Sequence, residues 1–420
     1  MNNKFRKYMA ILALGISGGS IYLLPYIKYI FYNQQIEAMG ITNQQSGFLL
    51  TMYAIGNVLL YIPGGILADK LSPKKCLLFS LISTTMLSVL FAFTLSYNIA
   101  LVIWLLLSLT TILVFWASLI KTVRMIGTDE EQGRVFGIYY AVNGITGAAG
   151  NAIALWASRS AVSARAAMFN VAMVYSAVTV IAALMIGLFI ENNKGPIVKK
   201  SEEDNFNVGD AVNLLKNPSV WLCSIIIFCG YSLYTSTSYF TPYLTSVFGI
   251  SSTKSGIYSI IRNYLFMLLA PISGFIADRI FKSTCKWIMT GFFISVILFV
   301  GVLIIPEGTN AAIIGIYTLL PGAFALAVYG IEFSVISESK IPQIYTGTVV
   351  GIASVIGYSP DLFIDVLYGS WLDKYGNTGY TYIFIFIGVI CVVGLTSAYI
   401  LRRHTIASIL HTKQQSVMSN

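Results

Sequence analysis

Five of the charged residues that lie within or at the edge of otherwise apolar segments stand out, because a charge is costly there unless it is compensated. Two of them are basic, Lys28 and Arg262, and three are acidic, Glu332, Asp361 and Asp365. A buried basic group can bind an anion, and a carboxyl group can carry a proton across an apolar barrier. We therefore predict an anion site at the two basic residues, with Asp361 as their resident partner. The three acidic residues are the candidate proton carriers.

Lys28 follows a stripe of small and aromatic residues in the first apolar segment. The stripe consists of Gly15, Gly19, Tyr22, Tyr26, Tyr29 and Asn33. On an ideal helix Lys28 lies roughly 120° from the centre of this stripe, and a kink at Pro25 would reconcile the two. The alternative is that Lys28 snorkels to the membrane interface. The predicted substrate-binding residues are Tyr22, Tyr26, Lys28, Asn143, Tyr234 and Arg262.

A second group of charges is expected to act in coupling or gating. Lys121 and Arg124 share a helix face at a spacing of three residues, and Glu332 occupies the corresponding part of a later segment, which suggests a gate pair. For the basic residues, retention of a loop on the inner side is the alternative explanation. The predicted coupling or gating residues are Asp69, Lys121, Arg124, Arg134, Asp278, Glu332, Asp361 and Asp365.

The elements that position these residues must be membrane helices. Of the 420 residues, 56% are hydrophobic and 10% are charged, and the mean hydropathy is +0.77. Apolar runs of about 20 residues, long enough to cross a bilayer, recur along the chain. We expect an all-α polytopic membrane protein with about twelve spans. Their predicted centres are Gly19, Ala54, Ser88, Thr110, Gly147, Val180, Gly230, Phe266, Val296, Leu320, Val355 and Val389.

The basic residues predict the topology, because positively charged loops stay in the cytoplasm. Of the 26 lysines and arginines, 20 fall in segments that would be cytoplasmic if the chain starts inside. We therefore expect a bacterial inner-membrane protein with both termini in the cytoplasm. The net charge of +9 is explained by these loops and does not indicate nucleic acid. The five cysteines show no metal spacing and the two histidines lie in the C-terminal tail, so neither a metal nor a cofactor is expected.

The chain is expected to consist of two six-helix halves, residues 1–191 and 218–420, joined by a cytoplasmic linker over residues 192–217. The longest polar stretch of the chain falls in this linker. Gly65 and Asp69 recur as Gly274 and Asp278 with the same spacing. Both copies would enter the membrane from the cytoplasm, which predicts a parallel repeat and two pseudo-symmetric halves.

The chain resembles the major facilitator superfamily over essentially its whole length. The signature after the second helix appears as Gly65, Asp69, Lys70, Lys74 and Lys75, although Ser72 and Pro73 replace the usual Gly and Arg. The stretches "SGGSIYLLPYIKYIFY" and "WASLIKTVRMIGTDEEQGRVFG" are similar to the YihN-like bacterial group, which is distantly similar to the organophosphate antiporters.

This resemblance implies roles for several residues. Asp69 would lie near the start of the eleventh helix and Asp278 near the fifth helix, which begins near Arg134, so each would latch the inner face; fixing the topology is the alternative for Asp69. A basic residue near the position of Lys28 binds the substrate anion in organophosphate antiporters. Their seventh-helix arginine is missing here, which argues against specificity for phosphate esters.

The leading functional prediction is secondary transport of a small, anionic organic solute by alternating access. A proton or a counter-solute is the possible coupling partner, membrane lipid is the surrounding medium, and a monomer is expected. A membrane-embedded enzyme is disfavoured, because the spans contain no histidine, metal cluster or Gly-x-Ser-x-Gly motif. A transporter-like receptor or sensor, and a facilitator of a neutral or lipid-like solute, remain alternatives.

Overall fold

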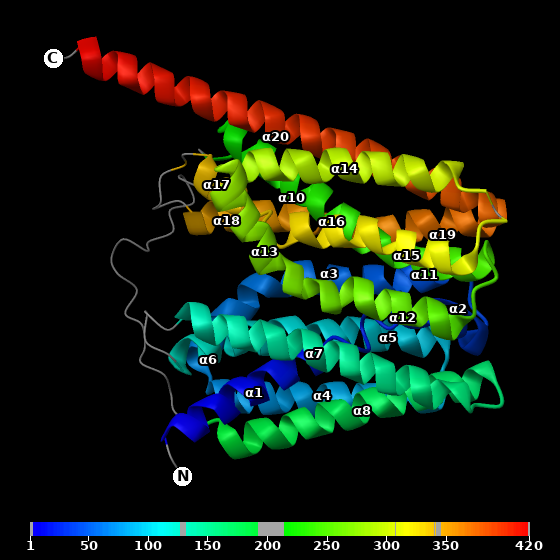
Figure 1. Cartoon of the computed structure of the whole chain (residues 1–420). Helices are drawn as coiled ribbons and strands as arrows, with labels where there is room; N and C mark the ends of the chain where they lie inside the picture. Colours follow the sequence, from blue (N-terminus) through cyan, green and yellow to red (C-terminus); the bar gives the residue numbers. More distant parts are fainter. Residues whose placement is uncertain are drawn as a thin grey trace. The chain divides into compact units, whose positions relative to one another are not determined.

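The computed structural model describes residues 3–126, 132–191, 214–306, 308–339, 341 and 346–418, and helices account for most of them (Figure 1). Contacts divide the chain into two compact units. Unit 1 comprises Met1–Val198, Ser238–Met267 and Asp361–Gly379, and unit 2 comprises Lys199–Thr237, Leu268–Pro360 and Tyr380–Asn420. The predicted halves are defined by the repeat and stay a prediction, and most of the predicted linker lies outside the described residues.

Unit 1 combines the N-terminal helices with two segments from later in the chain. Its helices are α1 (Asn3–Ile21), α2 (Lys28–Met39), α3 (Asn43–Lys70), α4 (Pro73–Thr94), α5 (Tyr97–Ser108), α6 (Ala117–Ile126), α7 (Gln132–Arg159), α8 (Ala164–Phe189), α11 (Phe240–Ser246), α12 (Ser252–Asn263) and α19 (Ile364–Tyr375). A π-helical segment, Leu109–Trp116, joins α5 to α6. The later segments bring α11, α12 and α19 against the N-terminal helices.

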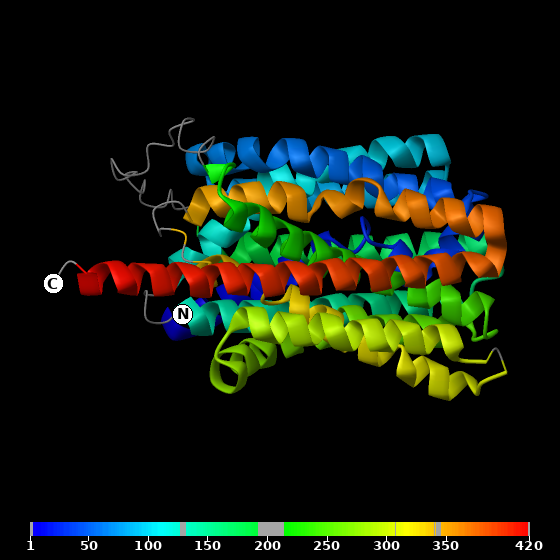
Figure 2. The same cartoon turned by 90° about the horizontal axis from the view of Figure 1, so that it is seen from above.

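Unit 2 contains the remaining helices, several of which are short. They are α10 (Pro218–Ser236), α13 (Leu269–Phe275), α14 (Thr284–Ile304), α15 (Ala311–Tyr317), α16 (Leu319–Tyr329), α17 (Ser334–Glu338), α18 (Thr346–Gly357) and α20 (Gly379–Met418). A π-helical turn, Ile276–Phe281, follows α13. Figure 2 shows α20, in red, as one long continuous helix.

Local sequence signals set several helix boundaries. Gly40 ends α2 in the left-handed region at φ 64°, which suits glycine because it has no Cβ. Thr42 then begins α3 with a capping box, in which its side chain accepts from the Gln45 amide and the Gln45 side chain accepts from the Thr42 amide. The two signals together make the tight connection between α2 and α3.

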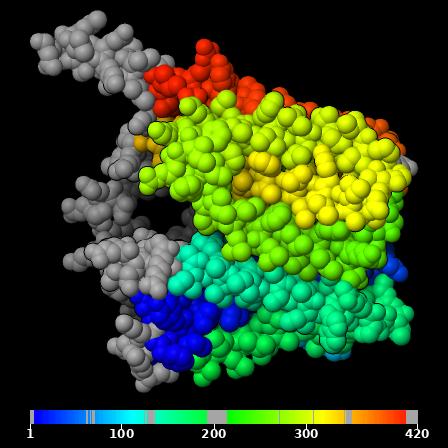
Figure 3. Space-filling model, viewed as in Figure 1, coloured from blue at the N-terminus to red at the C-terminus, as the bar shows by residue number. Residues whose placement is uncertain are grey.

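Glycines allow α1 to approach α7 closely. A Cβ on Gly15 would collide with Val142, and one on Gly19 would collide with the backbone of Asn143. Figure 3 shows the surface of α7, in teal, beside the blue helix α1, in agreement with their many contacts. The small residues of the predicted stripe therefore serve helix packing.

The helices agree with a polytopic membrane protein. Among the described residues, seven helices are long and apolar enough to span a membrane, or up to eight if a bent pair is counted as one span. Each of the twelve predicted centres lies in a helical segment, many of them in helices interrupted by turns. The structure is thus consistent with twelve spans, and one of the seven long segments, Val349–Ile406, contains two of the predicted centres, Val355 and Val389.

Candidate functional site

The first span is broken near the proline, where the sequence predicted a kink. Helix α1 ends at Ile21, and α2 begins at Lys28. In the intervening turns the indole N–H of Trp104 donates to the carbonyl oxygen of Pro25 over 3.1 Å, in a buried position. A break in a membrane helix frees backbone groups that need such partners. Trp104 therefore stabilises the break that positions Lys28.

We expect Trp104→Phe to destabilise the protein by about 1–3 kcal/mol, because the buried Pro25 carbonyl loses this donor while the aromatic packing is largely kept. The measurement is thermal unfolding of the purified protein in detergent. The matched control is Trp156→Phe, since the Trp156 side chain is 71% exposed. Equal melting temperatures for the two variants would contradict the role of the indole N–H.

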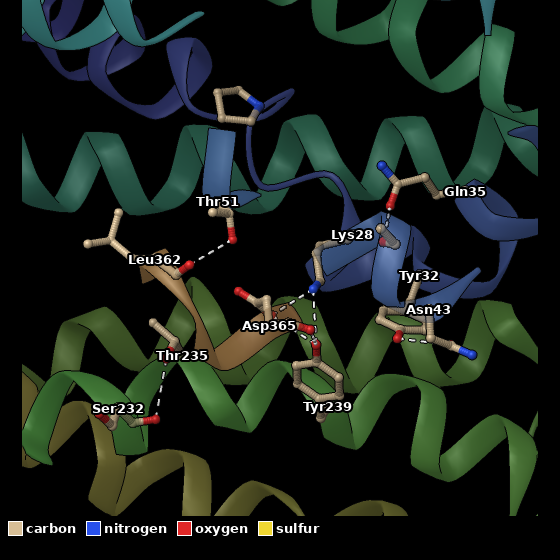
Figure 4. Close-up of polar contacts among 12 residues, drawn as sticks. Lys28, Tyr32, Gln35, Asn43, Thr51, Ser232, Thr235, Tyr239, Leu362 and Asp365 are labelled. Carbon is tan, nitrogen blue, oxygen red and sulfur yellow. Dashed lines mark hydrogen bonds and ion pairs between the residues drawn. The ribbon is translucent and has the colours of Figure 1, made fainter. Parts of the chain in front are cut away.

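Lys28 forms a buried ion pair with Asp365 (Figure 4). The distance from Lys28 Nζ to Asp365 Oδ1 is 2.6 Å, and the two side chains are 2% and 4% exposed. The Tyr239 hydroxyl accepts from Lys28 Nζ over 3.2 Å and lies 3.0 Å from Asp365 Oδ1, to which it donates. A Lys28 side chain buried in this way does not extend to the membrane interface, which contradicts the snorkelling alternative. The expectation that Asp361 is the resident partner was wrong for Lys28, because Asp365, in the first turn of α19, forms the ion pair instead.

Aromatic rings enclose the ion pair. The Lys28 ammonium lies 5.5 Å from the ring centroid of Tyr32 and 4.9 Å from that of Tyr239, distances typical of cation–π contacts. Tyr239 in turn packs edge-on against Tyr32 and Tyr368. The rings exclude water, which strengthens the attraction between the charges but also raises the cost of separating them without a substitute.

Arg262 lies in a second polar cluster of unit 1, on α12. Its side chain is 1% exposed, its Nη2 donates to Thr241 Oγ1 over 3.1 Å, and its guanidinium lies 5.4 Å from the centroid of Phe240. The hydroxyls of Thr241 and Ser259 both donate to the Tyr29 carbonyl oxygen, over 2.9 and 2.6 Å. Hydroxyl groups from α11 and α12 thus satisfy backbone groups of α2 beside the lysine.

Further contacts join α19 to the start of α3. The Asp373 carboxylate accepts from the backbone amides of Asn43 and Gln44 over 2.9 and 2.8 Å. The amide groups at a helix N-terminus are natural partners for a carboxylate. A Cβ on Gly47 would collide with the Asp365 backbone, and one on Gly369 with that of Asn43. Only glycines permit this close approach.

The other substrate-binding candidates of unit 1 lie in the first span, for Tyr22 and Tyr26, or on α7 beside it, for Asn143. Tyr22 packs edge-on against Phe115 at 6.4 Å, and Tyr26 packs against Tyr53 at 5.8 Å. The Asn143 amide donates to the hydroxyl of Tyr139 over 3.1 Å. These three candidates are half-buried, unlike Lys28. Asp361 is 6% exposed and interacts electrostatically with Lys28, so it belongs to the surroundings of the ion pair.

Unit 2 contains a separate buried carboxyl group, Glu332. It lies in the turn between α16 and α17 and is 0% exposed. Neither carboxyl oxygen has a hydrogen-bond partner among the described residues. A Cβ on Gly230 of α10 would collide with Glu332 Oε2, so glycine makes the room for this carboxyl group. An ionised carboxylate in such surroundings would be costly.

Four tyrosines cluster in unit 2. Two of them are close to Glu332 along the chain or through its neighbour: Tyr329 lies three residues before it, and Tyr231 follows Gly230, which faces its carboxyl group. Tyr234 stacks on Tyr329 with ring centroids 4.5 Å apart and planes 10° apart. Tyr231 packs against both of these rings and edge-on against Tyr358 at 4.7 Å. The sequence singled out Tyr234 from this group. Tyr231 is buried and the other three rings are half-buried, and aromatic faces with hydroxyl groups of this kind suit an organic solute.

The gating residues are less completely described. The side chains of Asp69, Arg124 and Arg134 lie outside the described part of the chain, so their predicted roles stay predictions. Asp278 is exposed and Lys121 is half-buried. The predicted gate pair between Lys121 and Glu332 also stays a prediction.

Three residues of the site were missed from the sequence. Tyr239 stands among several other hydroxyl-bearing residues in the sequence, and nothing distinguished it from its neighbours. Trp104 contacts a residue 79 positions earlier, and Asp373 caps a helix 330 positions earlier. A local sequence pattern does not predict partners that are so far apart in the chain. For Asp373, an acidic residue beside the outer end of a span could have suggested a capping role.

Comparison with known proteins agrees with this architecture. A family model described as Major Facilitator Superfamily matches residues 8–364. The chain is 31% identical over 389 residues to Inner membrane protein YihN of Escherichia coli (strain K12), covering 90% of this chain and 91% of YihN. It is 28% identical over 377 residues to Inner membrane protein YqcE of the same organism, covering 89% of each chain.

Solved structures share the fold at low sequence identity. A bacterial homolog to the human lysosomal transporter Spinster, in an inward-facing and unoccupied conformation, matches with a TM-score of 0.76 and 15% identity, over 96% of this chain and 98% of that chain. The nucleoside transporter NupG matches with a TM-score of 0.69 and 16% identity, over 96% and 99%. At such identities the likeness concerns the fold alone.

Proposed function

Because the chain belongs to the major facilitator superfamily, as its motifs predicted, we propose that it is a secondary transporter of a small organic anion. It would work by alternating access in the bacterial inner membrane, with both termini in the cytoplasm. The observation that carries the proposal is the buried pair of Lys28 and Asp365. Buried charges in membrane spans are retained where they handle a charged solute or a coupling ion.

The ion pair supports an anionic substrate, because Asp365 occupies the place that an arriving anion would take. The Lys28 Nζ lies 2.6 Å from the Asp365 carboxylate. Arg262 is a second buried basic residue of unit 1. An anion that replaces Asp365 at the ammonium group keeps that charge compensated while it breaks the internal pair. The binding free energy of the anion can therefore be used to release α19.

Release of α19 would matter for alternating access, because unit 1 joins segments from both predicted halves. Lys28, Asn43 and Gln44 come from the first half, and their partners Asp365 and Asp373 come from the second. In the proposed mechanism, these contacts within unit 1 would keep one end of the transport pathway closed. By the distribution of basic residues this end is the outer one. Opening it requires that the ion pair and the helix cap both separate.

Unit 2 contains residues that suit the carbon skeleton of an organic anion and the coupling of its transport to protons. The rings of Tyr231, Tyr234, Tyr329 and Tyr358 provide apolar faces with hydroxyl groups. Glu332, buried beside Gly230, is the preferred candidate for carrying a proton, since it has no counter-charge or hydrogen-bond donor among the described residues. Exchange of two anions is the alternative coupling mode.

The test has two stages. A thermal-shift screen of organic acids, sugar phosphates and sulfonates should identify an anion that stabilises the purified protein, because a ligand that binds only the folded state raises its stability. Counterflow of that labelled anion in proteoliposomes then separates transport from sensing. Binding without counterflow would favour a receptor, and stabilisation by neutral solutes or lysolipids alone would favour the facilitator alternative. Chemical conversion of the ligand would indicate an enzyme.

A further inference from the structure

Helices α4 and α8 form an apolar groove at the surface of unit 1. The groove has a volume of about 530 Å³, within the range of small-molecule sites. Its walls include Ile82 and Met86 of α4 and Leu184 and Leu188 of α8, and the side chains of Met86 and Leu188 are 67% and 71% exposed. Both helices are candidate membrane spans, so the groove opens toward lipid.

The one polar side chain that lines the groove turns its hydroxyl away from a ligand. Thr85 Oγ1 donates to the Leu81 carbonyl oxygen over 2.8 Å and lies 2.7 Å from Thr179 Oγ1. With its hydrogen bonds made inside the helix pair, Thr85 presents its methyl group as apolar surface. The groove is therefore suited to a hydrocarbon chain and not to a polar solute.

A positive charge lies at one end of the groove. Lys74 Nζ donates to the carbonyl oxygen of Gly187, a groove residue in the last turn of α8, over 2.7 Å. The carbonyl groups at a helix C-terminus attract cations, which fixes the ammonium group there. An ammonium group has three donors and this bond uses one. The remaining donors can bind an anionic oxygen at the mouth of the groove.

We propose that the groove is a binding site for an anionic phospholipid, with one acyl chain between α4 and α8 and the phosphate at Lys74. Charge complementarity selects this occupant, because an apolar channel that ends at a fixed ammonium group matches a hydrocarbon chain that ends at a phosphate. Open space lies beside Gly187, since a Cβ built on it would meet nothing within 4 Å, so a larger side chain at this position can enter the groove. The site is distinct from the Lys28 cluster and does not depend on the transported solute.

The test is native mass spectrometry of the full-length protein in detergent, titrated with palmitoyl-oleoyl-phosphatidylglycerol and, in parallel, with the corresponding phosphatidylcholine. Lys74→Gln removes the ammonium group, and Lys75→Gln is its control, because the neighbouring Lys75 is exposed and has the same formal charge. Gly187→Leu fills the groove. Gly388→Leu is its control, since a Cβ on Gly388 of α20 also meets nothing within 4 Å.

We expect the wild type to retain one phosphatidylglycerol with at least tenfold preference over phosphatidylcholine. Lys74→Gln and Gly187→Leu should each weaken this binding at least tenfold, while Lys74→Arg and the two controls stay within twofold of wild type. Equal losses in Lys74→Gln and Lys75→Gln would overturn the headgroup contact. Unchanged binding of phosphatidylglycerol in Gly187→Leu would contradict the groove as the binding site, and equal or tighter binding of phosphatidylcholine by the wild type would contradict an anionic lipid as the occupant.

Discussion

Lys28→Gln is expected to weaken binding of the transported anion at least 30-fold, roughly the 2 kcal/mol lower bound for losing one partner of a buried charge pair. The substitution also leaves Asp365 buried without its counter-charge, because the two groups are 2.6 Å apart and almost fully enclosed. A stability loss of about 3–5 kcal/mol is expected for such a broken pair. The measurements are thermal unfolding in detergent and affinity for the anion found in the screen.

Companion variants separate the structural from the functional effect. Lys28→Arg should keep most of the affinity, because the positive charge remains. Combining Lys28→Gln with Asp365→Asn should recover at least half of the lost stability, since neither charge is then left alone, while the affinity stays low. Asp365→Asn alone should bind the anion more tightly than wild type, because it removes the internal competitor. Wild-type affinity in both Lys28→Gln and the double variant would rule out anion recognition by Lys28.

Arg262 provides a second, independent test of the electropositive site. Arg262→Gln should lower the affinity for the anion, and Arg262→Lys should preserve part of it, if the guanidinium charge acts on the ligand. A purely structural role in holding Thr241 would instead lower the melting temperature in both variants without a selective loss of affinity. The comparison of affinity with melting temperature decides between the two roles.

Glu332→Gln is expected to abolish uptake driven by a pH gradient while exchange of labelled for unlabelled anion continues. Glutamine has nearly the same shape as a protonated glutamate but cannot release a proton. Because both carboxyl oxygens of Glu332 lack a hydrogen-bond partner among the described residues, the neutral side chain should be tolerated without loss of stability. The measurement is uptake into proteoliposomes with and without an imposed gradient.

The matched control is Glu37→Gln, since Glu37 is an exposed acidic residue on α2. It should leave gradient-driven uptake unchanged. Gly230→Ala tests the role of Glu332 in a second way. The alanine methyl group would collide with the Glu332 carboxyl group, so this variant should impair coupling to protons although the carboxyl group is still present. Gradient-driven uptake at the wild-type rate in Glu332→Gln would refute the proton-carrier role. If the wild type itself ignores the gradient, exchange of two anions becomes the better explanation.

Much of the fold could be predicted from composition and from short sequence patterns. A chain that is 56% hydrophobic and 10% charged, with apolar runs of bilayer length, has few options other than a bundle of membrane helices. Pro25 indicated the break in the first span, because proline removes a backbone donor wherever it stands. The rarity of charge inside the spans singled out Lys28, Arg262, Glu332 and both aspartates as candidate functional residues, and the structure buries all five.

The partners of these charges could not be read from the chain. Asp361 and Asp365 differ by only four positions, and the prediction from the sequence named the wrong one as the partner of Lys28. The structure places Asp361 in a 3-10 turn, Ser359–Leu362, and Asp365 in the following helix α19, where it pairs with Lys28. Irregular turns shift the angular positions of all later residues, and an ideal helix does not include them.

The sequence by itself therefore determined the class of protein, the family and the inventory of buried charges, because these depend on composition and on spacing along one chain. Only the tertiary structure decided that Asp365, Tyr239 and Lys28 form one cluster, that Trp104 supports the break, and that Glu332 has its own apolar enclosure in unit 2. These pairings join residues up to 337 positions apart. Packing of whole helices selects them, through glycines such as Gly47 and Gly369 whose importance appears only where two backbones meet.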